Sequence, residues 1–191
     1  MSARLKGQFL VAAAHLRDPN FYRSVVLLLE HNDQGAMGLV INRPSEISVE
    51  TALSTDLALA GTDAVVYSGG PVETSALMIL HNSQVLGKID EQIVSGVYLA
   101  GSQTSFDSLV QPPAEPSVDQ PGIRFRVYCG YAGWGAQQLE SEISRGDWHV
   151  VQSDSEMVLD NDPYGVWDIC VRRMHRANRI LPHNVRNPEW N

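Results

Sequence analysis

Three short polar segments, each placed directly after an apolar run, are the residues of this chain best suited to bind a ligand. They are Asn42 and Arg43; Ser68, Gly69 and Gly70; and Gly133, Trp134 and Gly135. If the ends of these runs meet at one side of a sheet, the segments form a pocket with backbone N–H donors, one guanidinium and one aromatic wall. An anion or the carboxylate of a partner protein is the natural ligand of such a pocket. The alternative is structural: Asn42 hydrogen bonds the adjacent turn, and Arg43 is solvated.

The third segment belongs to a glycine-rich stretch, Gly130 to Gly135, that leads into an amphipathic pattern. Three glycines in six residues indicate positive φ angles or a backbone pressed close to another group. We expect a turn at 133–135 between a strand and a helix, with the indole of Trp134 buried. The unpaired N–H groups at the start of that helix could hold a phosphate or carboxylate. Tight packing of the turn against the sheet is the alternative.

Recognisable catalytic motifs are absent from the chain. There is no G-x-S-x-G nucleophile motif, no phosphate-binding loop that ends in Gly-Lys-Ser/Thr, and no dinucleotide-binding G-x-G-x-x-G after a strand. The six histidines lack metal-ligand spacing, and the acidic residues around His31 belong to a turn, where polar residues are common. We therefore expect no metal and no cofactor. An enzyme would need a dispersed site in which His31, His81 or Cys129 works with residues distant in sequence.

The charge of the chain argues against direct binding of nucleic acid. The formal net charge is −8, whereas binding to a phosphate backbone depends on positive charge. From Cys170 onward five arginines face one glutamate, a net charge of +4, so the preceding residues carry −12. A basic helix end suits the helix dipole, and it could also form a contact surface. Without an apolar run of 18 residues or a signal-peptide pattern, we expect a cytoplasmic protein with no membrane segment and with reduced, buried cysteines.

Apolar runs separated by turn residues predict a strand-rich domain of about 190 residues. The predicted strands are 9–14, 24–30, 39–42, 64–67, 76–81, 93–99, 123–128 and 148–151, and the second and third form a hairpin. The predicted helices begin at Ser48, at Thr104, after the glycine-rich turn, and at Asp162 with Pro163 at the first helical position. We expect Pro44 to end a strand, residues 111–122 to form a proline-rich loop, and residues from about 180 to form an irregular tail. Because the strands do not alternate regularly with helices, the pattern favours a mixed or antiparallel sheet in one α+β domain spanning residues 1–191.

Several motifs in one order resemble the YqgE/AlgH family of bacterial proteins. They are Gly7 to Ala12, Asp18 to Leu28, His31, Gly35 to Pro44, Gly69 to Val72, Leu80-His81 and Gly130 to Gly135. The chain departs from the family at Gln137, where a glycine is common, at Ala13 and Ala14, where a proline is common, and in the loop at 112–121. The resemblance implies an α+β domain whose bifurcated sheet curls into a pseudo-barrel with flanking helices. It implies no established reaction, although one branch is associated with transcriptional regulation of exopolysaccharide synthesis.

The sequence therefore favours a cytoplasmic binding or regulatory module that acts through a protein partner or a small anionic ligand. The absence of catalytic motifs and the glycine-rich turns are the observations behind this interpretation. An enzyme with a dispersed active site is the alternative from a different class. Fold alone does not determine function. The regulatory association therefore belongs to the relatives, and for this chain it is only an expectation.

Overall fold

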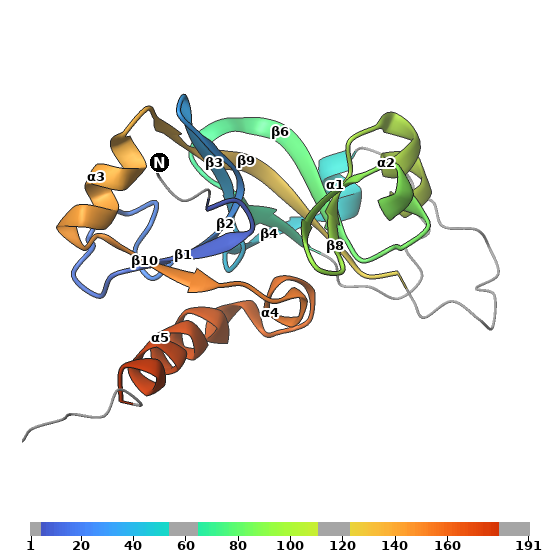
Figure 1. The fold of residues 1–191 in the computed structure, drawn as a ribbon. Helices are drawn as coiled ribbons and strands as arrows, with labels where there is room; N and C mark the ends of the chain where they lie inside the picture. Colours follow the sequence, from blue (N-terminus) through green and yellow to red (C-terminus); the bar gives the residue numbers. More distant parts are fainter. Residues whose placement is uncertain (1–4, 54–64, 111–122, 180–191) are drawn as a thin grey trace, which may run out of the picture.

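A long strand, β9, organises the fold, because it is shared between two parts of one large sheet (Figure 1). The computed structural model of the protein describes residues 5–53, 65–110 and 123–179. The strands in this part are β1 (Gln8–Ala12), β2 (Val25–Asn32), β3 (Gly35–Val40), β4 (Pro44–Ser48), β5 (Val65–Ser68), β6 (Val72–His81), β7 (Glu91–Val94), β8 (Val97–Leu99), β9 (Phe125–Gly135) and β10 (Trp148–Gln152). The helices are α1 (Val49–Leu53), α2 (Gln103–Val110), α3 (Gln138–Arg145), α4 (Ser155–Leu159) and α5 (Pro163–Arg179), with a 3₁₀ turn at Leu86–Lys88.

The sheet has the strand order β10-β1-β2-β3-β9-β6-β8-β7, and β4 and β5 form a branch that joins at β9. All pairs are antiparallel except β5 with β9. The sheet curls into a half-barrel, with α3 near one end, α1 and α2 near the other, and α5 beside β1 and β10 (Figure 1). The α+β fold class with a bifurcated, curled sheet and flanking helices is therefore confirmed.

Three apolar clusters hold the helices on the sheet. The largest joins α4 and α5 to the sheet through Met157, Val166 and Trp167, and the Trp167 indole also donates a hydrogen bond to the carbonyl of Ala12 at 2.8 Å. The second contains Leu139 of α3, and the third contains residues of α1 and α2. Strand β2 reads Val-Val-Leu-Leu-Leu because its two faces enter the first two clusters. A strand that is buried on both faces loses the usual apolar and polar alternation.

The expected turn at 133–135 is wrong, because β9 continues to Gly135. Gly133, Trp134 and Gly135 pair in register with Met37, Ala36 and Gly35 of β3. The positive φ angle lies earlier, at Gly130, with φ 71°. A Cβ atom at Gly130 would lie 2.6 Å from the carbonyl oxygen of Gly70, so glycine is required where the sheet branches.

Two other strand boundaries differ from the sequence-based expectation. Pro44 was expected to end a strand, but it begins β4. Within the described sheet β4 pairs only with β5, so proline, which has no N–H to donate, is tolerated at this position. The strand expected at 93–99 is two strands, β7 and β8, separated by a turn at Gly96 with φ 77°. The hairpin of β2 and β3 is confirmed, although its turn is shorter than expected, since Gly35 already belongs to β3.

The predicted starts of three helices can be compared with the side chains that cap them in the structure. Ser48 accepts a hydrogen bond from the Thr51 amide at 3.2 Å, as expected for the cap of α1. Asp162 precedes α5 and accepts from the Tyr164 amide, which confirms the predicted start. Helix α2 begins earlier than expected, since Ser102 rather than Thr104 accepts from the amide of the residue three positions later. The predicted loop at 111–122 and the tail from about 180 lie outside the described residues.

Candidate functional site

Asn42 is occupied with structural hydrogen bonds. Its Oδ1 accepts from the Val25 amide at 2.8 Å, and its Nδ2 donates to the Arg23 carbonyl at 2.9 Å. These bonds join the end of β3 to the start of β2. Asn42 therefore has a structural role, which was the alternative to ligand binding.

Arg43 is neither free nor simply solvated. Its two Nη atoms donate to the carbonyls of Pro19 at 2.9 Å and Tyr22 at 3.0 Å, in the loop that connects β1 with β2. Burial lowers the pKa of Arg43, and the negative charge of Asp18 opposes that shift. The guanidinium thus holds this loop against the end of β3.

Ser68, Gly69 and Gly70 lie beside Asn42 and Arg43, where β5 ends. The Ser68 amide donates to the Arg43 carbonyl at 2.8 Å. A Cβ atom at Gly69 would lie 2.2 Å from the carbonyl oxygen of Gly130. The two glycines therefore permit the close backbone contact with β9 at the branch of the sheet.

Gly133, Trp134 and Gly135 lie toward the other end of β3. Trp134 pairs with Ala36, whereas Val40 bonds the carbonyl of Gly69, so the two groups are separated by about 13 Å of strand. The Trp134 indole is 6% exposed and stacks on Phe21, with ring centroids 6.1 Å apart. The predicted residues thus form two groups, with the aromatic ring packed in a core rather than beside the guanidinium.

Glu142 of α3 explains the position of Trp134. No sequence motif had indicated a role for Glu142. Its Oε2 accepts from the indole nitrogens of Trp134 at 2.9 Å and Trp148 at 2.8 Å. Its Oε1 accepts from the side-chain Nε2 of Gln138 at 3.0 Å. One carboxylate therefore ties α3 to both β9 and β10.

His31 is buried, and both of its ring nitrogens have partners. Nδ1 accepts from the Leu5 amide at 3.1 Å, so the proton of the neutral ring is on Nε2, which donates to Glu140 Oε1 at 3.0 Å. The ring therefore has no free lone pair to serve as a general base. Across the described ranges, no group of three or more His, Cys, Asp or Glu side chains is placed to hold a metal ion.

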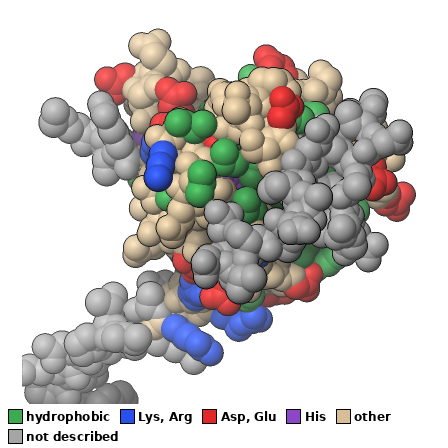
Figure 2. Space-filling view, turned by 90° about the vertical axis from the view of Figure 1, so that its right-hand side faces the viewer, with side chains coloured by type: hydrophobic (Ala, Val, Ile, Leu, Met, Phe, Trp, Pro, Cys, Tyr) green, Lys and Arg blue, Asp and Glu red, His purple; other side chains and the backbone are tan. Residues whose placement is uncertain are grey.

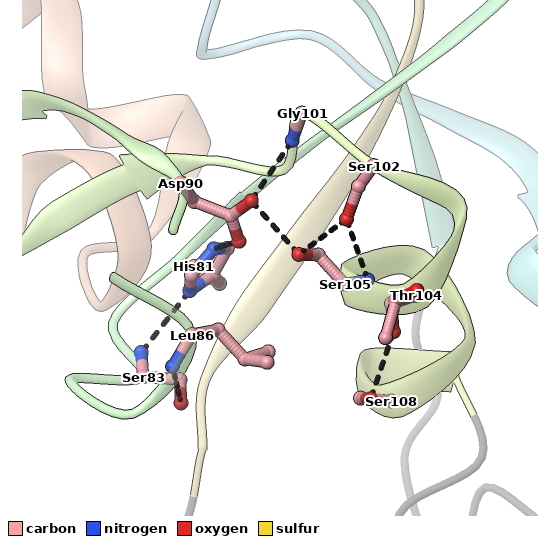
Figure 3. A network of polar contacts seen from close by, with 9 residues as sticks. All are labelled: His81, Ser83, Leu86, Asp90, Gly101, Ser102, Thr104, Ser105 and Ser108. Atoms are coloured by element: carbon pink, nitrogen blue, oxygen red, sulfur yellow. Dashed lines mark hydrogen bonds and ion pairs between the residues drawn. The ribbon is translucent and has the colours of Figure 1, made fainter. Parts of the chain in front are cut away.

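His81 belongs to a buried polar network centred on Asp90 (Figure 3). Its Nδ1 accepts from the Ser83 amide at 3.2 Å, and its Nε2 donates to Asp90 Oδ2 at 3.0 Å. Ser105 donates to Asp90 Oδ1 at 2.8 Å, and the Gly101 amide bonds the same oxygen. In a nucleophilic triad the histidine lies between serine and carboxylate, whereas here the carboxylate lies between them. The network therefore joins β6 to α2, and it lacks the order needed to activate Ser105.

The two cysteines are free thiols in environments that disfavour the thiolate. Burial raises the pKa of Cys129, which is partly buried, and raises the pKa of the fully buried Cys170 to about 11. Because the thiolate is the nucleophile, both residues are poor nucleophiles near neutral pH.

An open groove of about 830 Å³ runs along β10. Its walls come from the end of α3, from β10 and the residues after it, and from α5. They are Ile143, Gly146, Trp148, His149, Val150, Val151, Gln152, Ser153, Asp154, Arg173 and Met174. None of the sequence-predicted site residues lines this groove. Its walls come from elements that are brought together only when α5 packs beside the edge of the sheet, so no local sequence pattern indicates it.

Comparison with known proteins gives consistent relatives. The sequence model of a family described as AlgH-like matches residues 9–178. A UPF0301 protein of Myxococcus xanthus is 40% identical over 168 residues, which cover 86% of this chain and 88% of the relative. A UPF0301 protein of Streptomyces coelicolor is 39% identical over 171 residues, covering 88% and 86%.

Two solved structures share the fold. The solution structure of the AlgH protein from Pseudomonas aeruginosa matches with a TM-score of 0.66 and 32% identity, covering 96% of this chain and 92% of that one. A crystal structure of a protein from Corynebacterium diphtheriae matches with a TM-score of 0.71 and 22% identity, covering 90% and 88%. The second likeness concerns the fold alone.

Proposed function

This chain belongs to the AlgH-like family, and we propose that it acts as a cytoplasmic binding module that recognises a protein partner in the groove along β10. The observation that carries the proposal is the groove itself, which is open, about 830 Å³ in volume, and lined by both apolar and polar side chains. Protein-binding sites combine apolar and polar side chains, and residues of both kinds line this groove.

The size and position of the groove favour a protein partner over a small anionic ligand. A volume of this order is large for a small anion, and the groove runs along an exposed strand. Arg43, the guanidinium first considered for an anion, already donates to two carbonyls.

A role in regulation is compatible with such a module. In the described part of the chain, no helix is long and apolar enough to cross a membrane. A net charge of −8 disfavours direct contact with DNA, so an effect on transcription would pass through a partner protein. This link to transcription rests on the resemblance to the branch associated with exopolysaccharide regulation.

The enzyme alternative receives less support. His31 and His81 each use both ring nitrogens in hydrogen bonds, and burial raises the pKa of Cys129. The three side chains first considered for catalysis are therefore poorly suited to act as a general base or a nucleophile.

The test is partner capture by matched variants. Val150 lines the groove and is 40% exposed, whereas Val85 is 60% exposed on a different part of the fold. Tagged wild type, Val150→Glu and Val85→Glu proteins are used as bait in native lysate, followed by quantitative mass spectrometry. We expect at least one protein to bind wild type and Val85→Glu equally and to be about tenfold depleted with Val150→Glu. Partners that bind all three baits equally, or no specific partner, would overturn the proposal.

A further inference from the structure

Strand β10 is an edge strand of the described sheet. Among the described strands it pairs only with β1, with Phe9 opposite Val151 and Val11 opposite His149. The Ala13 amide donates to the Asp147 carbonyl at 2.9 Å, which continues this ladder. An edge strand presents a row of backbone donors and acceptors that can template another strand.

The pairing pattern identifies which backbone groups are available. In an antiparallel pair, residues that bond the partner strand alternate with residues whose N–H and C=O point away from it. Because Asp147 bonds β1, His149 and Val151 do so as well, and the groups of Trp148, Val150 and Gln152 point outward. Within the described part of the chain, no backbone hydrogen bond occupies the outward groups of Val150.

This edge carries little protection against pairing. Natural edge strands are often blocked by proline, lysine or a bulge, yet β10 reads Trp-His-Val-Val-Gln and pairs with β1 in continuous register. The groove of about 830 Å³ lies along it, with Met174 and Arg173 of α5 among its lining residues. Five residues of strand span about 17 Å, so the groove has room for a short extended segment.

Helix α5 carries exposed arginines beside the residues that line the groove. Arg173 lines the groove and bonds Asp154, so these two charges compensate each other, whereas Arg172 and Arg176 are exposed on the same helix. Arg173 and Arg176 are three positions apart and therefore neighbours on the helix surface. Figure 2, which draws the side of α1 and α2, shows basic and acidic side chains together at the bottom, at the height of α5 in Figure 1. The residues before Cys170 carry a net charge of −12, so the arginines of α5 stand against an acidic body.

We propose that β10 binds an extended, acidic segment of a partner protein as an added β-strand, with its carboxylates facing the arginines of α5. This inference rests on the proposed function and specifies the chemistry of the partner. Backbone pairing with Trp148, Val150 and Gln152 supplies affinity, and the arginines select acidic side chains. A second copy that pairs through its own β10 is a poorer occupant, because the strand Trp-His-Val-Val-Gln carries no carboxylate to face the arginines.

Amide hydrogen exchange followed by NMR provides the test, with two synthetic peptides as probes. One is a blocked ten-residue peptide of alternating valine and glutamate, and the other has lysine in place of glutamate. We expect the acidic peptide to bind about tenfold more tightly than the basic one and to lose affinity in high salt. The Val150 and Gln152 amides should become protected on binding, whereas His149 and Val151 are protected already by β1.

Matched variants separate backbone pairing from charge. Val150→Pro removes an outward donor and should abolish peptide binding, whereas Val85→Pro at a residue with φ −69° should leave it unchanged. Arg176→Gln should weaken binding of the acidic peptide severalfold, and Arg17→Gln, at an exposed arginine in the loop after β1, should not. The melting temperature of each variant reports whether it is folded.

The outcomes distinguish this inference from the proposed function. If neither peptide binds at millimolar concentration, or if Val150 and Gln152 stay unprotected in the bound state, strand addition is wrong, while groove-dependent partner capture would leave the proposed function standing. Protection in the free protein that rises with concentration would identify a second copy as the occupant. Protection independent of concentration would identify a segment of this chain. Either result overturns the inference.

Discussion

The indole N–H of Trp134 and the carboxylate of Glu142 form a 2.9 Å hydrogen bond, and the same carboxylate oxygen accepts from Trp148. Trp134 lies near the end of β9, Glu142 lies in α3, and Trp148 begins β10. One half-buried carboxylate therefore fixes the helix to the two strands that flank it in sequence. The same bonds also hold the start of β10, the edge strand of the groove, next to α3.

Glu142→Ala should destabilise the fold by about 2–4 kcal/mol, because it leaves two indole donors without a partner. Glu156→Ala, at an exposed glutamate whose side chain makes no hydrogen bond within the described ranges, should change stability by less than about 0.5 kcal/mol. Urea denaturation measures both values. An equal, small effect of the two substitutions would show that the carboxylate is not a structural centre.

Gln137→Gly should stabilise the protein by about 0.5–1 kcal/mol, since Gln137 has φ 61° and a side chain in this region is strained. The bonds made by the Gln137 carbonyl would be retained. Gln138→Gly, in α3, should instead destabilise, because it loses two side-chain bonds and helix propensity. A thermal unfolding curve for each variant checks the opposite signs.

Arg43→Ala should destabilise by about 1 kcal/mol, because the loop between β1 and β2 loses two hydrogen bonds to a charged donor that is partly exposed. A solvated Arg43, the alternative considered from the sequence, would instead leave the melting temperature nearly unchanged. Arg17→Ala, in the same loop, serves as the control in denaturant titration. Equal midpoints for the two variants would contradict a structural role of Arg43.

His81 should make the fold less stable in weak acid. Burial lowers the pKa of His81 below its ordinary 6.5, and Asp90 opposes the shift only in part. The unfolded chain therefore binds the proton at a higher pH, so the free energy of unfolding falls as pH decreases below about 6.5. His81→Gln can still donate to Asp90 but does not titrate, and its stability should fall less steeply between pH 7 and pH 5. Parallel pH profiles in urea titrations would exclude this effect of His81.

The thiols should react slowly in the native protein at pH 8. Burial raises the pKa of both, to about 11 for Cys170, so the thiolate fraction is small, and Cys170 is also inaccessible. A colourimetric thiol assay should show both reacting quickly only after denaturation. Rapid modification of native Cys129 would revive the enzyme alternative.

The sequence by itself determined the elements whose signals are local. The hairpin of β2 and β3, the start of α5 at Asp162, and the burial of Trp134 follow from apolar runs, turn residues and cap chemistry within a few positions. The motifs also identified the family, and with it the curled, bifurcated sheet. Local patterns are informative here because strand, turn and cap preferences depend on neighbouring residues.

Only the tertiary structure decided which residues meet. The glycines at 133–135 are strand rather than turn because β3 pairs with them, and a pairing between distant segments is not encoded in either segment alone. Glu142 and Asp90 were missed because their partners are distributed over separate elements. The groove depends on β10 being an edge and on α5 packing beside it, which is a property of strand order in space and therefore of the complete fold.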